Sequence, residues 1–213
     1  YSSTRDFGRA LERALRRSGV PMAYSAGFHP HPKISYANGA ATGAASEAEY
    51  FEISVTERVD PDALATALDA ALPDGLDIVS VVEAQPGALA DRLQASRWLL
   101  EFPGVELADL ERAVAGFLAQ ERVEVSRMFK KGVKSYDARE PVIRAETGLS
   151  DEGCAILTMV VRHTTPAVRP DDVLSAITAA TSFAPPRSPK ATRLAQGIWS
   201  SETESVADPL AAD

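Results

Sequence analysis

Apolar residues near the start of the chain follow a helical period. Phe7, Leu11 and Leu15 lie three or four positions apart within residues 4–18, so they share one face of a helix. Gly19 follows directly, and glycine is the residue that most often ends a helix in the left-handed conformation. The pattern therefore predicts a helix over residues 4–18.

Strand-like alternation and a second helix follow. Residues 33–37, 50–55 and 76–82 alternate apolar and polar side chains or are rich in β-branched residues, which predicts strands. Asp60 and Pro61 open a second helix, as N-cap and first helical residue. In the second half, the same reasoning predicts strands at 98–102, 123–129, 155–162 and 193–199, and helices at 107–117 and 170–180.

A short internal match links the two halves. The ten residues from Val59, VDPDALATAL, align with the ten from Val168, VRPDDVLSAI. With the element order, this match predicts an α+β protein with two ferredoxin-like (βαββαβ) halves in tandem, at residues 1–95 and 96–199. The first strand of the first half would precede Tyr1. Residues 200–213 carry four acids and no base, which predicts a disordered acidic tail.

Composition narrows the class of protein. The net charge is −8, and the single cysteine excludes an internal disulfide and a Cys-based cluster. We expect Cys154 to act as a small apolar residue. No apolar run is long enough to cross a bilayer, so we expect a cytoplasmic protein with no membrane partner, no metal and no cofactor.

The charge is distributed in blocks. Residues 1–33 carry six bases against two acids, residues 34–91 one base against eleven, and residues 122–144 seven against three. A basic surface can therefore exist on an acidic chain. The first block repeats at helical spacing, which predicts a phosphate-binding stripe formed by Arg5, Arg9, Arg13, Arg16 and Arg17. The alternative is a solvated polar face.

The stretch GFHPHPK combines histidine, lysine and an aromatic ring with proline-stiffened backbone. One interpretation is RNA binding. The rings of Tyr24, Phe28 and Tyr36 would stack on bases, and His29, His31 and Lys33 would contact phosphates. Acid–base catalysis by one histidine and packing of the rings on the sheet stay open as alternatives. A metal site would need a third ligand.

The last basic block predicts a flexible cationic hairpin around Gly132 that clamps a polyanion, through Lys130, Lys131, Lys134 and Arg139. An ordinary exposed loop is the alternative. Asp137, next to Tyr136, is either a catalytic acid or the partner of a local ion pair with Arg139. The catalytic hypothesis requires this hairpin and the histidine loop to meet across a cleft.

Residues 5–53, including GFHPHPKISYANGA, together with KKGVKSYDAREPVIR and RLAQG, resemble the radical-SAM-linked protein family in its stand-alone form. The resemblance implies a domain of unknown function that is fused to radical SAM enzymes in some bacteria and encoded separately in others. Thr4 stands where the family commonly has a histidine, which would impair any catalysis through that position.

These observations together lead to a functional expectation. We expect an accessory RNA-binding module linked to RNA modification or processing, without catalytic activity of its own. One alternative is an RNA-processing or RNA-modifying enzyme that uses the histidine loop. The other is a protein partner of a radical SAM enzyme. The expected partners are therefore RNA and such an enzyme.

Overall fold

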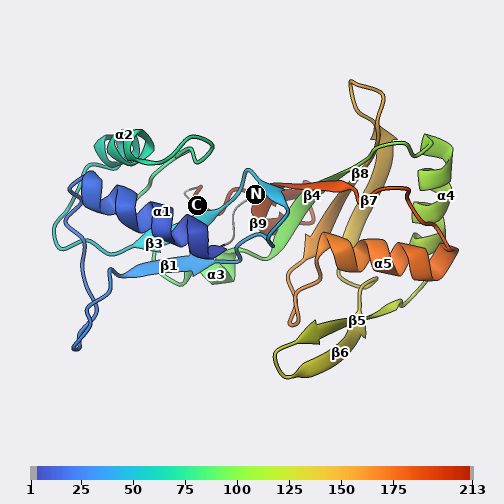
Figure 1. Ribbon diagram of the computed structural model, residues 1–213, viewed down its shortest axis with the longest axis horizontal. Helices are drawn as coiled ribbons and strands as arrows, with labels where there is room; N and C mark the ends of the chain where they lie inside the picture. Colours follow the sequence, from blue (N-terminus) through green and yellow to red (C-terminus); the bar gives the residue numbers. More distant parts are fainter. Residues whose placement is uncertain (1–3, 212–213) are drawn as a thin grey trace. The chain divides into compact units, whose positions relative to one another are not determined.

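The computed structural model describes residues 4–211, with side chains from Asp6 onward (Figure 1). The fold is α+β, and the chain forms two compact units. Of the described residues, the first comprises 4–43 and Glu49–Asp91, and the second comprises Ala44–Ala48 and Arg92–Ala211.

The first unit packs two helices on a two-stranded antiparallel sheet. Helix α1 is Thr4–Arg17, strands β1 and β3 are Ile34–Ala37 and Tyr50–Ile53, and helix α2 is Pro61–Ala71. Their apolar faces form one core, made of Leu11, Ala14, Leu15, Met22, Leu64 and Leu68. The predicted helices and the first two predicted strands are therefore present.

The signals that begin and end these helices act as predicted. Gly19 follows α1 with φ of 67°, a conformation that costs glycine little. The carboxylate of Asp60 accepts a hydrogen bond from the backbone N–H of Asp62 at 3.1 Å and caps α2, with Pro61 at the first helical position.

The predicted strand over residues 76–82 is wrong. The backbone N–H of Ile78 donates to the side-chain carboxylate of Asp69 at 2.8 Å, where a strand residue would use a neighbouring strand. Ile78 and Val81 pack against the core of the unit, whereas Val79 is 89% exposed. The β-branched residues thus form an extended segment without a ladder. A short helix, α3 (Leu89–Arg92), follows.

The second unit is built on a larger antiparallel sheet, in the order β10-β9-β4-β8-β7. Its strands are β4 (Ala95–Phe102), β7 (Val142–Leu149), β8 (Ala155–Arg162), β9 (Lys190–Ser200) and β10 (Ser205–Ala207). Helices α4 (Leu107–Leu118) and α5 (Pro170–Thr181) pack against each other, and α4 also lies against β7 and β8. The core contains fully buried Phe102, Phe117, Leu157 and Met159.

The strand predicted over residues 123–129 exists but lies outside this sheet. Strand β5 (Glu124–Phe129) pairs with β6 (Gly132–Asp137) in a separate two-stranded hairpin, seen below α5 in Figure 1. Strand β7, which was not predicted, takes the position beside β8. Alternation of side chains is the same in a projecting hairpin and in an edge strand, so the pattern does not distinguish them.

The predicted disorder of residues 200–213 is wrong for the described part of the tail. Strand β10 pairs antiparallel with β9, and Pro209 is buried. Gly197 permits this contact, because a Cβ at that position would lie 1.9 Å from the carbonyl oxygen of Ala207. Backbone pairing thus orders an acidic segment that composition alone marks as unfolded.

Residues of the first half also complete the second sheet. Strand β2 (Ala45–Ser46) pairs parallel with β9. The side-chain amide of Gln196 donates to the carbonyl of Ala48 at 2.6 Å, and Arg193 donates to the hydroxyl of Ser46 at 3.2 Å. Five residues therefore leave the first unit, join the second and return. No helix within residues 4–211 has the length and apolar character needed to cross a bilayer.

Candidate nucleic-acid interface

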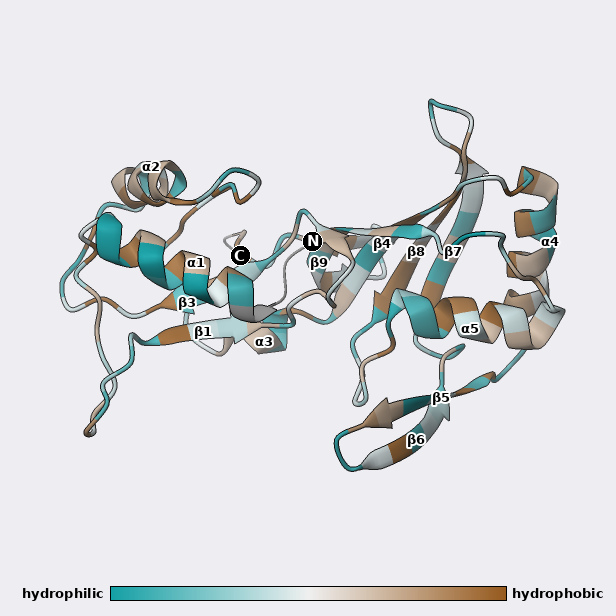
Figure 2. Ribbon diagram, in the orientation of Figure 1, coloured by the Kyte–Doolittle hydropathy of each residue, from teal (hydrophilic) through white to brown (hydrophobic). Residues whose placement is uncertain are grey.

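Helix α1 carries the predicted arginines on the face opposite its core contacts. Arg9, Arg13, Arg16 and Arg17 are exposed, while Leu11, Ala14 and Leu15 are buried. At 3.6 residues per turn, these four positions span an arc of roughly 100°. Figure 2 shows hydrophilic and hydrophobic residues alternating along α1 as this arrangement requires. We call these four residues the arginine stripe. Arg5 lies on the first turn of α1, and its side chain is outside the described residues.

The surroundings of the arginine stripe leave its charge largely uncompensated. No acidic residue occurs between Glu12 and Glu47. Among the residues that the structure describes, no carboxylate forms an ion pair with any of the four guanidinium groups. Guanidinium presents a planar fork of donors that matches phosphate, so the stripe is suited to a polyanion backbone.

The loop with the histidines forms an ordered projection, which we call the finger (residues 24–32). Tyr24 and Pro32 form a β-bridge at its base, and the backbone N–H of Ser25 donates to the carbonyl of His31 at 2.8 Å. The base is tied to the residue that follows β3, because the N–H of Ala23 donates to the carbonyl of Ser54 at 2.8 Å. The finger therefore extends from the sheet (Figure 1).

The aromatic rings of the finger face solvent. Phe28 is fully exposed at 101%, and Tyr24 is 51% exposed. Packing of these rings on the sheet, the alternative to stacking, is therefore wrong for Phe28. Tyr36 behaves differently, because its ring makes an edge contact with Phe7 at a centroid distance of 6.1 Å. Burial, and then the charge of Glu12, raises the pKa of Tyr36.

His29, His31 and Lys33 are exposed, on the finger or directly after it. Within residues 4–211, no group of three or more histidine, cysteine or acidic side chains lies close enough to hold a metal ion. The finger belongs to the first unit, whereas Tyr136 and Asp137 belong to the second. The finger therefore presents two exposed rings and two imidazoles, and the ammonium group of Lys33 follows directly after it.

The β5–β6 hairpin displays the remaining predicted lysines. Lys130 and Lys131 form its exposed turn, and Lys134 is exposed with its ammonium 5.6 Å from the centroid of the Phe129 ring. On the same face, Arg127 lies 4.8 Å from Phe129 and 5.3 Å from Tyr136. The hairpin is therefore cationic at its tip, and cation–π contacts order its base.

Arg127 fixes the hairpin to helix α5. Its guanidinium pairs with Asp172 and also donates to the carbonyl of Ala167 at 3.0 Å. The Arg127 and Asp172 side chains are 20% and 9% exposed. Burial, and then the neighbouring Asp172 carboxylate, raises the pKa of Tyr136 to about 12. The hydroxyl of Tyr136 is consequently protonated at neutral pH and cannot serve as a base.

Asp137 and Arg139 have structural roles, in contrast to both predictions for Asp137. The Asp137 carboxylate accepts hydrogen bonds from the backbone N–H groups of Val123 and Arg139, at 3.0 and 2.9 Å, and from Glu140. Burial alone would raise the pKa of Asp137, but these backbone hydrogen bonds hold it below its ordinary value. Asp137 is therefore a capping residue of the hairpin base.

The guanidinium of Arg139 donates to the carbonyls of Leu118 and Val142, at 3.2 and 3.1 Å, and lies 5.7 Å from the Phe117 ring. It ties the end of α4 to the start of β7. Because two backbone carbonyls and a ring occupy this cation, the structure gives no support to Arg139 as a phosphate ligand.

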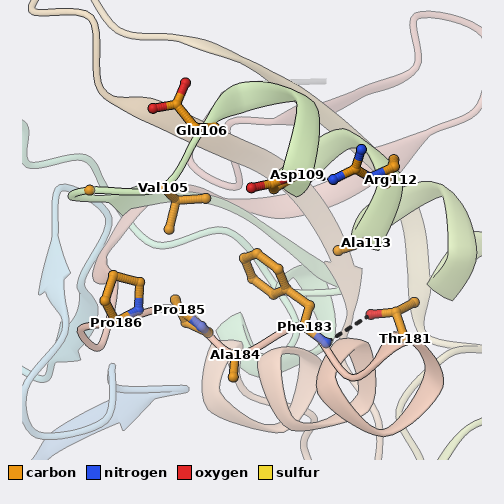
Figure 3. A pocket seen from close by; sticks show the side chains of 11 residues that line it. Val105, Glu106, Asp109, Arg112, Ala113, Thr181, Phe183, Ala184, Pro185 and Pro186 are labelled. Carbon is orange, nitrogen blue, oxygen red and sulfur yellow. Dashed lines mark hydrogen bonds and ion pairs between the residues drawn. The ribbon is translucent and has the colours of Figure 1, made fainter.

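A groove of about 440 Å³ lies in the second unit, between the first turns of α4 and the segment after α5 (Figure 3). Its walls include Val105, Phe183 and Pro186. Glu106 and Asp109 lie on its α4 side, and Asp109 pairs with Arg112. These carboxylates disfavour a phosphate group, so the groove does not extend a cationic surface.

A buried Ser–His pair was not anticipated from the sequence. The Ser96 hydroxyl donates to Nε2 of His163 at 2.7 Å, since Nδ1 must donate to the carbonyl of Leu93, at 2.6 Å. A hydroxyl held on an imidazole resembles a nucleophile and its base. Ser96 is only 2% exposed, however, so no substrate reaches it. The pair joins the start of β4 to the end of β8.

This pair predicts a pH dependence of stability. Burial lowers the pKa of His163 below 6.5, and the positive charge of Arg193 lowers it further. The hydrogen bond to the carbonyl of Leu93 raises this pKa, but by less than burial lowers it. The unfolded chain therefore binds a proton near pH 6.5 that the folded chain rejects, so stability is full above that pH and falls as the pH decreases below it. We expect His163→Gln to flatten the stability profile between pH 7 and 5, measured by urea unfolding. His29→Gln, at an exposed position, is the control and should retain the wild-type slope.

The comparisons with known proteins give a family but no activity. No curated protein matches the chain. The family model described as "uncharacterized protein conserved in bacteria (DUF2344)" matches residues 1–170. The match includes all of the first unit's helices and strands, the finger and the β5–β6 hairpin. The chain therefore belongs to this bacterial family.

Proposed function

We propose that the protein is a cytoplasmic accessory module that binds RNA for an RNA-modifying or RNA-processing enzyme and is not itself catalytic. One observation supports the proposal most strongly: α1 presents four exposed arginines that form no ion pair with a carboxylate of the described residues, and the chain has no acid from Arg13 to Ser46. Like charges three or four positions apart on a helix repel each other by roughly 0.2–0.5 kcal/mol per pair, and a bound anion would offset this repulsion.

The form of the cationic surface favours a nucleic acid over a small anion. The arginine stripe runs along about two and a half turns of one helix, so it matches a chain of phosphates and not a single phosphate group. The finger of the same unit adds exposed aromatic rings. These rings could stack on bases, which a nucleic acid has and a free phosphate ion lacks. Unstacked bases that can use such rings are most common in single-stranded RNA.

The partner enzyme follows from the resemblance of the sequence to radical-SAM-linked proteins. We propose a radical SAM enzyme as the recipient of the bound RNA. We also propose that both units are ferredoxin-like. In the second unit, the order β9-β4-β8-β7, with α4 after β4 and α5 after β8, supports this. The first unit supplies only β1, β3 and two helices toward the same pattern.

Equilibrium binding tests the proposal. Fluorescence anisotropy would follow a labelled single-stranded RNA of about 20 nucleotides across a salt series. Because single strands give a slope of about −0.7 per phosphate contact, four contacts predict a slope near −3 for log K against log salt. A slope near zero, or no binding at about 50 mM salt, would show that the protein is not an RNA-binding module.

A further inference from the structure

We propose that the finger is a base-stacking element and that the ligand is single-stranded RNA, with an unpaired base on the ring of Phe28. This inference rests on the proposed function and narrows its substrate class. The ring is fully exposed at 101%, and no base is available to it in a regular duplex, where the bases stack on one another.

Backbone hydrogen bonds order the base of the finger, from which the loop that carries Phe28 projects. Beyond the bridge between Tyr24 and Pro32, the backbone N–H of His31 donates to the Ser25 hydroxyl at 3.0 Å. Lys33 N–H donates to the carbonyl of Ala23 at 2.9 Å and closes the base. A ring on an ordered loop loses little conformational entropy on binding, so a single stacking contact adds affinity efficiently.

The residues that follow Phe28 favour a polyanion as the ligand of the finger. His29, His31 and Lys33 follow Phe28 within five residues, and the nearest acids along the chain are Glu12 and Glu47. A polyanion that also offers flat apolar groups is therefore complementary, and single-stranded RNA has both. Insertion into an anionic membrane would need a contiguous apolar patch, whereas here one fully exposed ring is flanked by imidazoles. Stacking needs only one ring for each base.

The test compares Phe28→Ala and Phe28→Trp with wild type on a 12-nucleotide single strand and on its duplex. We expect Phe28→Ala to weaken single-strand binding about tenfold and Phe28→Trp to retain it, because every base stacks on an aromatic face. Duplex binding, which uses phosphates, should be the same in all three proteins. Val79→Ala, at another exposed apolar position of the first unit, is the control and should bind as wild type.

The possible outcomes separate the two proposals. Wild-type affinity of Phe28→Ala for the single strand, or equal losses on single strand and duplex, would overturn the stacking role while leaving RNA binding intact. Absence of binding to both RNAs by the wild-type protein would overturn the proposed function itself. Binding to phosphatidylserine vesicles without RNA binding would identify a membrane surface and overturn both.

Discussion

Replacing both Arg13 and Arg16 by glutamate is expected to reduce RNA affinity at about 100 mM salt by roughly 100-fold or more. The two side chains are exposed and lie near the middle and the end of the arginine stripe. The double variant removes two phosphate contacts and places two carboxylates where phosphates would lie. The salt slope should become shallower by about 1.4, from two lost contacts on a single strand.

A matched control separates local contacts from net charge. Arg58→Glu with Arg122→Glu changes the total charge by the same amount, at exposed arginines that already pair with Glu83 and Glu124. This control should bind RNA within a few fold of wild type. Equal losses in the two double variants would mean that the overall charge, and not the arginine stripe, governs binding. Circular dichroism should show both variants folded, because all four sites are on the surface.

Replacing Asp172 by alanine is expected to destabilise the second unit by about 3 kcal/mol. The carboxylate pairs with Arg127 and accepts the backbone N–H of Arg169 at 2.8 Å, at the start of α5. Its loss leaves a guanidinium that is mostly buried without its charge partner, and α5 without its N-terminal acceptor. Because the pair retains some solvent access, we expect less than the full cost of a buried unpaired charge.

Tryptophan fluorescence reads this unit selectively. Both tryptophans, Trp98 and Trp199, belong to the second unit, so urea unfolding followed by their emission reports its stability. Asp171→Ala is the matched control: the residue is exposed in the same helical turn, and its loss should cost below about 1 kcal/mol. Comparable costs for the two variants would show that Asp172 acts only through the helix dipole.

Local signals in the sequence were sufficient for α1, α2, α4 and α5, whereas the one-turn helix α3 was not predicted. The arginine stripe, the glycine after α1 and the Asp60 cap all depend on residues within one or two turns, where spacing determines contact. The same locality explains why the exposed cations of α1 and the hairpin turn were predicted correctly as surface positions.

Contacts between distant residues were not predictable. Arg139 lies two residues from Asp137, which favoured an ion pair, yet it bonds the carbonyl of Leu118, at a separation of 21 residues. The pairing of β2 with β9 was also not predictable, because the two strands are far apart in the sequence. The alanine-rich segment around β2 carries no signal that it joins β9, since the partner is almost 150 residues away.

The failed strand at residues 76–82 and the ordered tail are opposite errors with one cause. β-branched composition favours an extended backbone, but a strand exists only where another strand supplies hydrogen bonds. Ile78 finds a side-chain carboxylate, whereas Val206, in an acidic tail, finds Trp199 on β9. Amino-acid composition indicates whether a segment favours an extended backbone. Whether that segment forms a strand depends on a second segment that supplies the hydrogen bonds.

Ultraviolet cross-linking of a bound single-stranded RNA, followed by tryptic digestion and mass spectrometry, tests the central claim most directly. Cleavage after Arg17 and Lys33 releases residues 18–33 as one peptide that contains Tyr24 and Phe28. We expect this peptide to carry the main nucleotide adduct and to lose it in Phe28→Ala. Adducts confined to peptides from residues 92–211, with residues 18–33 unmodified, would contradict it.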